Sequence, residues 1–126
     1  MKSKKVIAMG VAGCMLLSCV QANAKTLAES FSGGSNYDYV SYNSKSDTYK
    51  YKKTTYAKTV GYEGMHYVRA YIGGSKNDPS GAEADSGRKW SSSNIKATAS
   101  VTESISGNSV LFYKSYFPTG YSKYGK

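Results

Sequence analysis

Residues 95–117 constrain the fold most, because they contain two segments with a period of two residues, separated by a short polar turn. Small apolar residues alternate with polar ones in the first run, and aliphatic and aromatic residues recur in the second. Ser106, Gly107, Asn108 and Ser109 separate the two runs, and a polar turn between alternating segments is typical of a β-hairpin. The sequence therefore predicts a hairpin whose apolar face must be covered by other strands, since a lone hairpin is marginally stable.

Three earlier segments, residues 36–43, 48–60 and 65–72, show the same alternation. Turn-forming residues separate them at 44–47 and 61–64. No segment after the first 24 residues has helical periodicity. Five or six short strands joined by turns predict an all-β fold, either a small antiparallel β-sandwich or a small barrel.

The segments outside these strands are predicted to be irregular. Residues 25–35 are interpreted as an N-terminal arm with at most one short strand, and residues 118–126 as a frayed tail. Residues 73–87 are rich in Gly, Asn, Asp and Pro and predict a long loop. This loop holds Asp78, Glu83 and Asp85, but their spacing lacks the order of a calcium loop, which favours a solvated loop over a cation site.

The first 24 residues have the pattern of a signal peptide. Three lysines precede an apolar run at 6–20, and Ala22-Asn23-Ala24 is a small-x-small cleavage site, so cleavage is predicted after Ala24. The apolar run is shorter than the about 18 residues of a membrane span, so no transmembrane segment is expected in the mature chain, residues 25–126. Secretion is the predicted outcome. The alternative is a lipid anchor at Cys19, because Leu16-Leu17-Ser18-Cys19 resembles a lipobox.

Cleavage changes both the thiol content and the charge of the chain. It removes both cysteines, so the mature chain has no disulfide. It also leaves 17 − 3 = 14 basic and 8 acidic residues, a net charge of +6. A basic exported protein is attracted to cell-wall polymers, lipid phosphates or acidic glycans. Nucleic acid is not an expected partner, because the signal sends the chain away from it.

The sequence offers no catalytic constellation. His66 is the single histidine, and it lies in a predicted inward row with Val68, Ala70 and Ile72, which indicates a satisfied imidazole rather than a metal ligand. There is no Gly-x-Ser-x-Gly motif and no phosphate-binding glycine loop. We therefore expect no enzyme activity, no metal and no cofactor.

Two strand faces carry candidate binding residues. In residues 48–60 one face presents Lys50, Lys52 and Lys58, which predicts either a lysine-protected edge strand or a basic patch for a phosphate-bearing partner. In residues 65–72 the outward row is Tyr67, Arg69 and Tyr71. This row suits a cross-strand ladder or a contact with sugar and phosphate.

A third group of candidates, Arg88, Lys89 and Trp90, precedes the predicted hairpin. Trp90 is the only tryptophan, and we expect it to close one end of the core. The alternative is that Trp90 stacks on a ligand beside the two cations.

Residues 66–117 contain, in order, a predicted strand that begins at His66, a hydrophilic Gly-rich loop, and the motif Ser86-Gly87-Arg88-Lys89-Trp90. They continue with the run 95–99, a Ser/Gly/Asn turn and the aromatic segment 111–114. In this layout the chain resembles the lactococcin 972 family of secreted bacteriocins. The resemblance implies a sandwich of two three-stranded antiparallel sheets. It also implies a non-enzymatic antibacterial activity, in which the protein binds the cell-wall precursor lipid II and blocks septum formation.

A second functional class stays open. The Tyr-, Ser- and Gly-rich composition and the possible anchor at Cys19 are also typical of a surface-associated structural or glycan-binding module without killing activity.

Overall fold

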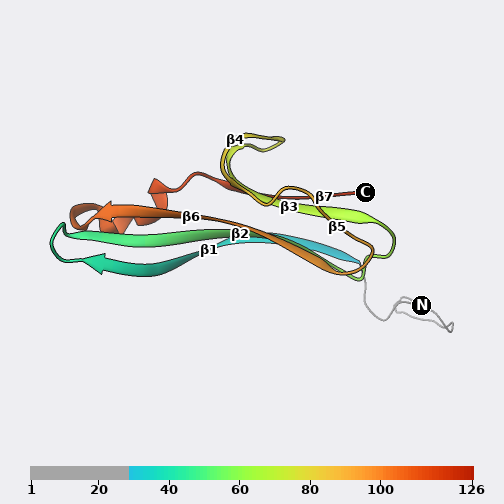
Figure 1. The fold of residues 1–126 in the computed structure, drawn as a ribbon, viewed down its shortest axis with the longest axis horizontal. Helices are drawn as coiled ribbons and strands as arrows, with labels where there is room; N and C mark the ends of the chain where they lie inside the picture. Colours follow the sequence, from blue (N-terminus) through green and yellow to red (C-terminus); the bar gives the residue numbers. More distant parts are fainter. Residues whose placement is uncertain (1–28) are drawn as a thin grey trace, which may run out of the picture.

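Two antiparallel β-sheets pack face to face in the computed structural model, which describes residues 29–126 (Figure 1). The prediction of a small all-β sandwich is confirmed. The predicted signal peptide, its cleavage at Ala24 and the alternative anchor at Cys19 lie outside the described residues.

The first sheet contains β1 (Ser30–Asn43), β2 (Thr48–Val60) and β6 (Ile95–Ser106), in the order β1-β2-β6. β2 therefore pairs on both sides, and its interpretation as an edge strand protected by lysine is wrong. β1 is long enough to pair with β2 along its whole length, from Ser30 opposite Val60 to Asn43 opposite Thr48, so this side of β2 is not a free edge. Most of the segment predicted as an arm is thus strand, because Ser and Gly residues hid its alternation.

A β-bulge in β1 changes which tyrosines share a face. The register shifts between Tyr39 and Ser41, so that Tyr39 lies opposite Tyr51 and Tyr42 lies opposite Tyr49. Residues directly opposite each other project to the same face of a sheet. Because Tyr49 and Tyr51 share one face of β2, Tyr39 and Tyr42 also share that face. Without the bulge, strict alternation puts positions 39 and 42 on opposite faces of a strand.

In the second sheet, every strand pairs with β3 (His66–Ser75). Its partners are β4 (Asp78–Asp85), β5 (Lys89–Ser91) and β7 (Gly120–Gly125). The prediction of a loop at 73–87 is wrong, because β3 continues to Ser75, the chain turns at residues 76–77, and it returns as β4. Gly73 and Gly74, with φ of 90° and 74°, lie within β3 where its register with β4 shifts. Residues that usually break a strand, here the two glycines, produce irregularities within a hairpin and do not separate its strands.

The prediction of a frayed tail is also wrong. In β7, Tyr121 lies opposite Tyr71 and their rings stack with centroids 5.2 Å apart. The hydroxyl of Ser122 donates to the carbonyl oxygen of Tyr56 at 2.6 Å, which ties β7 to the first sheet as well.

The predicted hairpin at 95–117 is half correct. Its first strand is β6, but its second strand is instead a 3-10 helix, η1 (Gly107–Tyr116). In residues 110–117 both alternating rows are mainly apolar or aromatic, with one polar residue in each, Lys114 and Ser115, so alternation does not select one face to bury. The Tyr113 ring instead stacks on Tyr51 of β2, with centroids 4.0 Å apart.

The core lies between the sheets and is made of small side chains. Ala57 of β2 packs with Val68, Ala70, Ala97 and Ala99, and all five are buried. The predicted inward row of β3 is confirmed, since His66, Val68, Ala70 and Ile72 are fully or almost fully buried.

Candidate functional site

A cleft of about 200 Å³ lies on the outer face of the second sheet, and we call it the β3 cleft. Alternation along β3 produces it, because the side chains that do not enter the core project outward. Strands β3 and β7, the β3–β4 turn and the segment before β5 line it with Tyr67, Arg69, Tyr71, Asn77, Pro79, Arg88, Lys123 and Tyr124.

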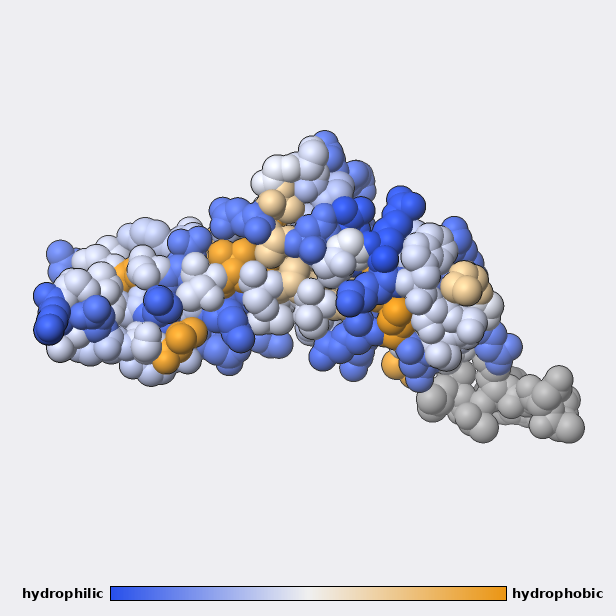
Figure 2. All heavy atoms as spheres, viewed as in Figure 1, coloured by the Kyte–Doolittle hydropathy of each residue, from blue (hydrophilic) through white to orange (hydrophobic). Residues whose placement is uncertain are grey.

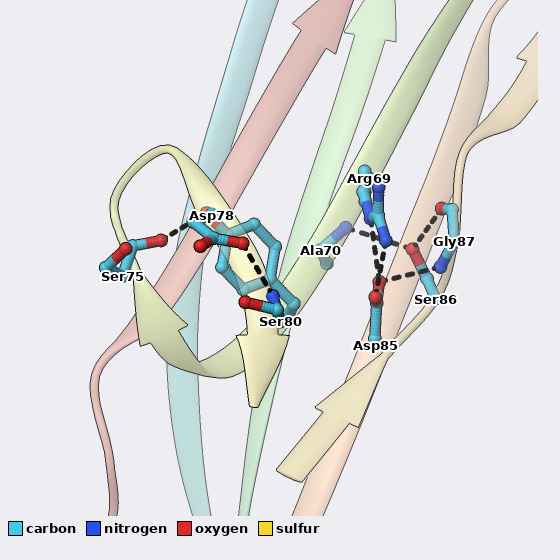
Figure 3. A network of polar contacts seen from close by, with 9 residues as sticks. Arg69, Ala70, Ser75, Asp78, Ser80, Asp85, Ser86 and Gly87 are labelled. Carbon is cyan, nitrogen blue, oxygen red and sulfur yellow. Dashed lines mark hydrogen bonds and ion pairs between the residues drawn. The ribbon is translucent and has the colours of Figure 1, made fainter. Parts of the chain in front are cut away.

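Arg69 is fixed in the cleft by an ion pair with Asp85 of β4 (Figure 3). Its Nε and Nη2 atoms donate to the two carboxylate oxygens at 2.8 and 2.6 Å, and the backbone N–H of Gly87 donates to the same carboxylate at 2.8 Å. The hydrogen bonds from Arg69 hold the pKa of Asp85 below its usual value, and the same pairing raises the pKa of Arg69. Arg69 thus contributes shape and hydrogen bonding, while its charge is compensated.

Tyr71 is part of the scaffold. Only 1% of its surface is exposed. Its hydroxyl lies 2.6 Å from the carbonyl oxygen of Ser75 and 2.8 Å from that of Lys76, and it donates to this turn. Burial raises the pKa of the Tyr71 hydroxyl, so it stays a neutral donor.

Arg88, Tyr67 and Trp90 lie side by side at the rim of the cleft, and the Tyr67 and Trp90 rings are tilted by 56° to each other. The Arg88 guanidinium lies 4.6 Å from the centroid of the Tyr67 ring, and the Tyr67 and Trp90 centroids are 5.0 Å apart. Trp90 is 49% exposed, so the prediction that it closes the core is wrong. Its position opposite Tyr67 in the β3–β5 pairing places it on the outer face.

Lys123 and Asn77 were missed by sequence reasoning. Lys123 of β7 lies opposite Arg69, and its ammonium donates to the side-chain oxygen of Asn77 at 2.9 Å. Residues 121–124, Tyr-Ser-Lys-Tyr, show no clear alternation, and the breakers at 118–120 suggested a tail. With Lys123 and Arg88 beside the compensated Arg69–Asp85 pair, the cleft has two uncompensated positive charges among its described residues.

The other predicted candidates lie elsewhere. Lys89 lies opposite Val68 in the β3–β5 pairing, away from the row of Tyr67 and Trp90. The three lysines of β2 are exposed on the outer face of the first sheet, on the opposite side of the sandwich from the β3 cleft; they are Lys50, Lys52 and Lys58.

His66 has the satisfied, buried imidazole that the sequence predicts. Its Nδ1 lies 2.9 Å from the carbonyl oxygen of Gly64 and its Nε2 lies 2.8 Å from the hydroxyl of Thr59. Since a carbonyl only accepts, Nδ1 carries the proton and Nε2 accepts from Thr59. Within residues 29–126 no three His, Cys, Asp or Glu side chains group as metal ligands do.

No family model, curated protein or solved structure matches this chain. In the part of the chain that the structure describes, no helix has the length and apolar character needed to cross a membrane.

Proposed function

We propose that the protein is a secreted, non-enzymatic antibacterial protein that binds an anionic component of the bacterial envelope, such as lipid II, and interferes with cell-wall or septum synthesis. The observation that carries the proposal is the placement of two uncompensated cations, Arg88 and Lys123, in one cleft with the half-exposed Trp90 ring at its rim.

The chemistry of the β3 cleft suits a sugar linked to phosphate. Guanidinium and ammonium groups donate charge-assisted hydrogen bonds to phosphate oxygens. The exposed face of Trp90, held against Tyr67, offers a flat apolar surface for a sugar ring. The lipid II target comes from the resemblance to the bacteriocin family, and the cleft is compatible with it.

The test measures binding of the purified protein to lipid II in detergent micelles, alongside growth inhibition of bacteria related to the producer. We expect Arg88→Gln/Lys123→Gln to weaken binding by at least about tenfold, since each charged hydrogen bond contributes about 1.5–3 kcal/mol. The matched control is Lys76→Gln/Lys126→Gln, which removes the same charge at exposed positions outside the cleft. An equal loss in both variants, or no binding and no inhibition by the unmodified protein, would contradict the proposal.

A second function is supported by the half-exposed Trp90 ring alone, which packs against Tyr67. Exposed aromatic faces also bind neutral glycans, and this is the property expected of a surface-associated or lipid-anchored glycan-binding module. Cell fractionation and a glycan array separate the two functions, because the module predicts retention on the producer and sugar binding without killing.

A further inference from the structure

A second concave site lies on the first sheet, where β2 ends and β6 begins. It is a hollow of about 240 Å³, lined by Lys58, Thr59, Val60, Asn94, Ile95 and Lys96, and we call it the Lys58–Lys96 hollow. Neither the resemblance nor the β3 cleft accounts for it.

The two lysines of the hollow are placed unfavourably for stability. Lys58 and Lys96 lie directly opposite each other in the β2–β6 register, and both are exposed. Like charges in this arrangement destabilise a sheet. Within residues 29–126 no carboxylate forms an ion pair with either ammonium; Lys96 lies over the Tyr56 ring, with its nitrogen 5.4 Å from the centroid. An anion between the two lysines would remove the repulsion.

Asn94 supplies a third donor. Its side-chain oxygen accepts the backbone N–H of Gly61 at 2.8 Å, which orients the amide and leaves its NH2 group as the free donor. Thr59 does not compete for a ligand, because its hydroxyl is bonded to His66. Two ammonium groups and one amide around a shallow hollow suit a tetrahedral phosphate with several oxygen acceptors.

The same face continues toward a second pair of cations. Lys50 and Lys52 lie on the outer face of β2, and from Lys58 to Lys52 the strand covers about 20 Å at 3.3 Å per residue. The neighbours between the two pairs are mainly polar, as shown by the Thr54–Ser100 hydrogen bond of 3.0 Å. Asp38, opposite Lys52, is the one acidic residue that the register places on this face of the described chain.

We propose that the outer face of the β1–β2–β6 sheet binds a linear phosphodiester polymer of the cell envelope, with one phosphate in the Lys58–Lys96 hollow and a later one at Lys50 and Lys52. Two cation pairs separated along a flat, polar face fit a chain of repeated phosphates better than a single headgroup. The large exposed apolar side chains that insertion into a bilayer requires are absent between the pairs. This site lies on the far side of the sandwich from the β3 cleft and does not depend on it.

The test measures affinity for purified linear poly(glycerol phosphate), with inorganic phosphate and phosphatidylglycerol vesicles as separate arms. We expect Lys58→Gln/Lys96→Gln to weaken polymer binding at least about tenfold, and Lys50→Gln/Lys52→Gln to weaken it less. Lys76→Gln/Lys126→Gln is the matched control, because it removes two exposed positive charges outside both sites, and it should change polymer affinity by less than about threefold. Equal losses in all three variants indicate a net-charge effect and overturn the proposal. Binding of inorganic phosphate or of vesicles as tightly as the polymer also overturns it.

A stability measurement separates a binding role from a structural one. Lys58→Gln relieves the repulsion with Lys96, so at low salt the variant should have a higher melting temperature and a lower polymer affinity. The difference in melting temperature should disappear near 1 M salt, where charges are screened beyond about 3 Å. A lower melting temperature at low salt would mean that Lys58 supports the sheet, and would overturn the proposed role.

Discussion

The inner face of the β1–β2–β6 sheet is covered in two different ways along β2. At the Ala57 end, β3 and β7 pack on it with small side chains, and the core residues there are buried. At the Tyr49 end, η1 covers it with stacked aromatic rings, and η1 itself contains no buried residue. Figure 1 shows the second sheet over one half of the first sheet and η1 at the other half.

The difference concerns how each end gains stability. Small residues let two sheets approach closely, so the free energy comes from complete burial and tight packing. Large tyrosines remain partly exposed and contribute through ring contacts and hydroxyl groups that stay in water. Figure 2 shows hydrophobic residues on the visible surface in small separated groups, with hydrophilic residues over the rest. We therefore expect the second-sheet end to carry most of the free energy of unfolding.

The largest effect should come from a truncation in the buried core. Ile72 is fully buried, and Ile72→Ala should lower the free energy of unfolding by about 2–5 kcal/mol, measured by urea denaturation. Leu111 of η1 is 88% exposed, so Leu111→Ala serves as the control and should change stability by less than about 0.5 kcal/mol. Similar decreases in the free energy of unfolding in both variants would show that the second-sheet end does not contribute more stability than the η1 end.

An intermediate effect should come from the aromatic end. Tyr113 stacks on Tyr51 and contacts the edge of Tyr37, so Tyr113→Ala should cost about 1–2 kcal/mol. Hydrogen exchange should show faster exchange in η1 and little change in β3. Phe112→Ala is the matched control, because that ring is 68% exposed. Equally faster exchange in β3 would show that the two ends unfold as one unit.

The smallest effect should be a pH dependence confined to the second-sheet end. The pKa of Asp85 is lowered by Arg69, so the stabilisation is complete above the unfolded value of about 3.9 and is lost as pH falls through the folded value. Because both side chains are partly exposed, the loss should be about 0.5–1 kcal/mol. Asp85→Asn should reduce the dependence of stability on pH between about 5 and 2. An unchanged profile in that variant would assign the acid sensitivity to other carboxylates.

Alternation predicted those strands in which one row is apolar and the other polar. β2, β6 and the inward row of β3 follow this pattern, and their faces were predicted correctly. It failed in residues 110–117, where both rows are mainly apolar or aromatic. It also failed in the segments 25–35, 73–87 and 118–126, where Gly, Ser or Pro obscure the period. For residues 118–126 the pairing partner, β3, is distant in the sequence, and local sequence does not contain that information. For residues 73–87 the partner is the neighbouring β3, and the register shifts near Gly73 conceal the hairpin.

The candidate site was predicted in part for the same reason. Tyr67, Arg69 and Arg88 were named from local pattern, and the structure brings them to one cleft. Lys123 was missed because its place beside Arg69 depends on the pairing of β7 with β3. Tyr71 was predicted to be an outward contact residue and is buried, whereas Trp90 was predicted to be a core residue and is half exposed. A period of two residues predicts which face of the strand a side chain lies on, but it does not predict what covers that face.

The pairing of β7 with β3 also determines the order in which the molecule is assembled. β1 and β2 are joined by a four-residue turn and can pair as soon as both are synthesised. Tyr71 and Tyr121 are 121 − 71 = 50 residues apart, so β3 has an unpaired side until the chain has been extended through residue 125. Closing so long a loop is slow compared with forming a hairpin. We therefore expect the nascent chain to pass through a stage in which the β1–β2 and β3–β4 hairpins can form while β3 still has one open edge. This stage is the one most open to chaperones, proteases and misassociation.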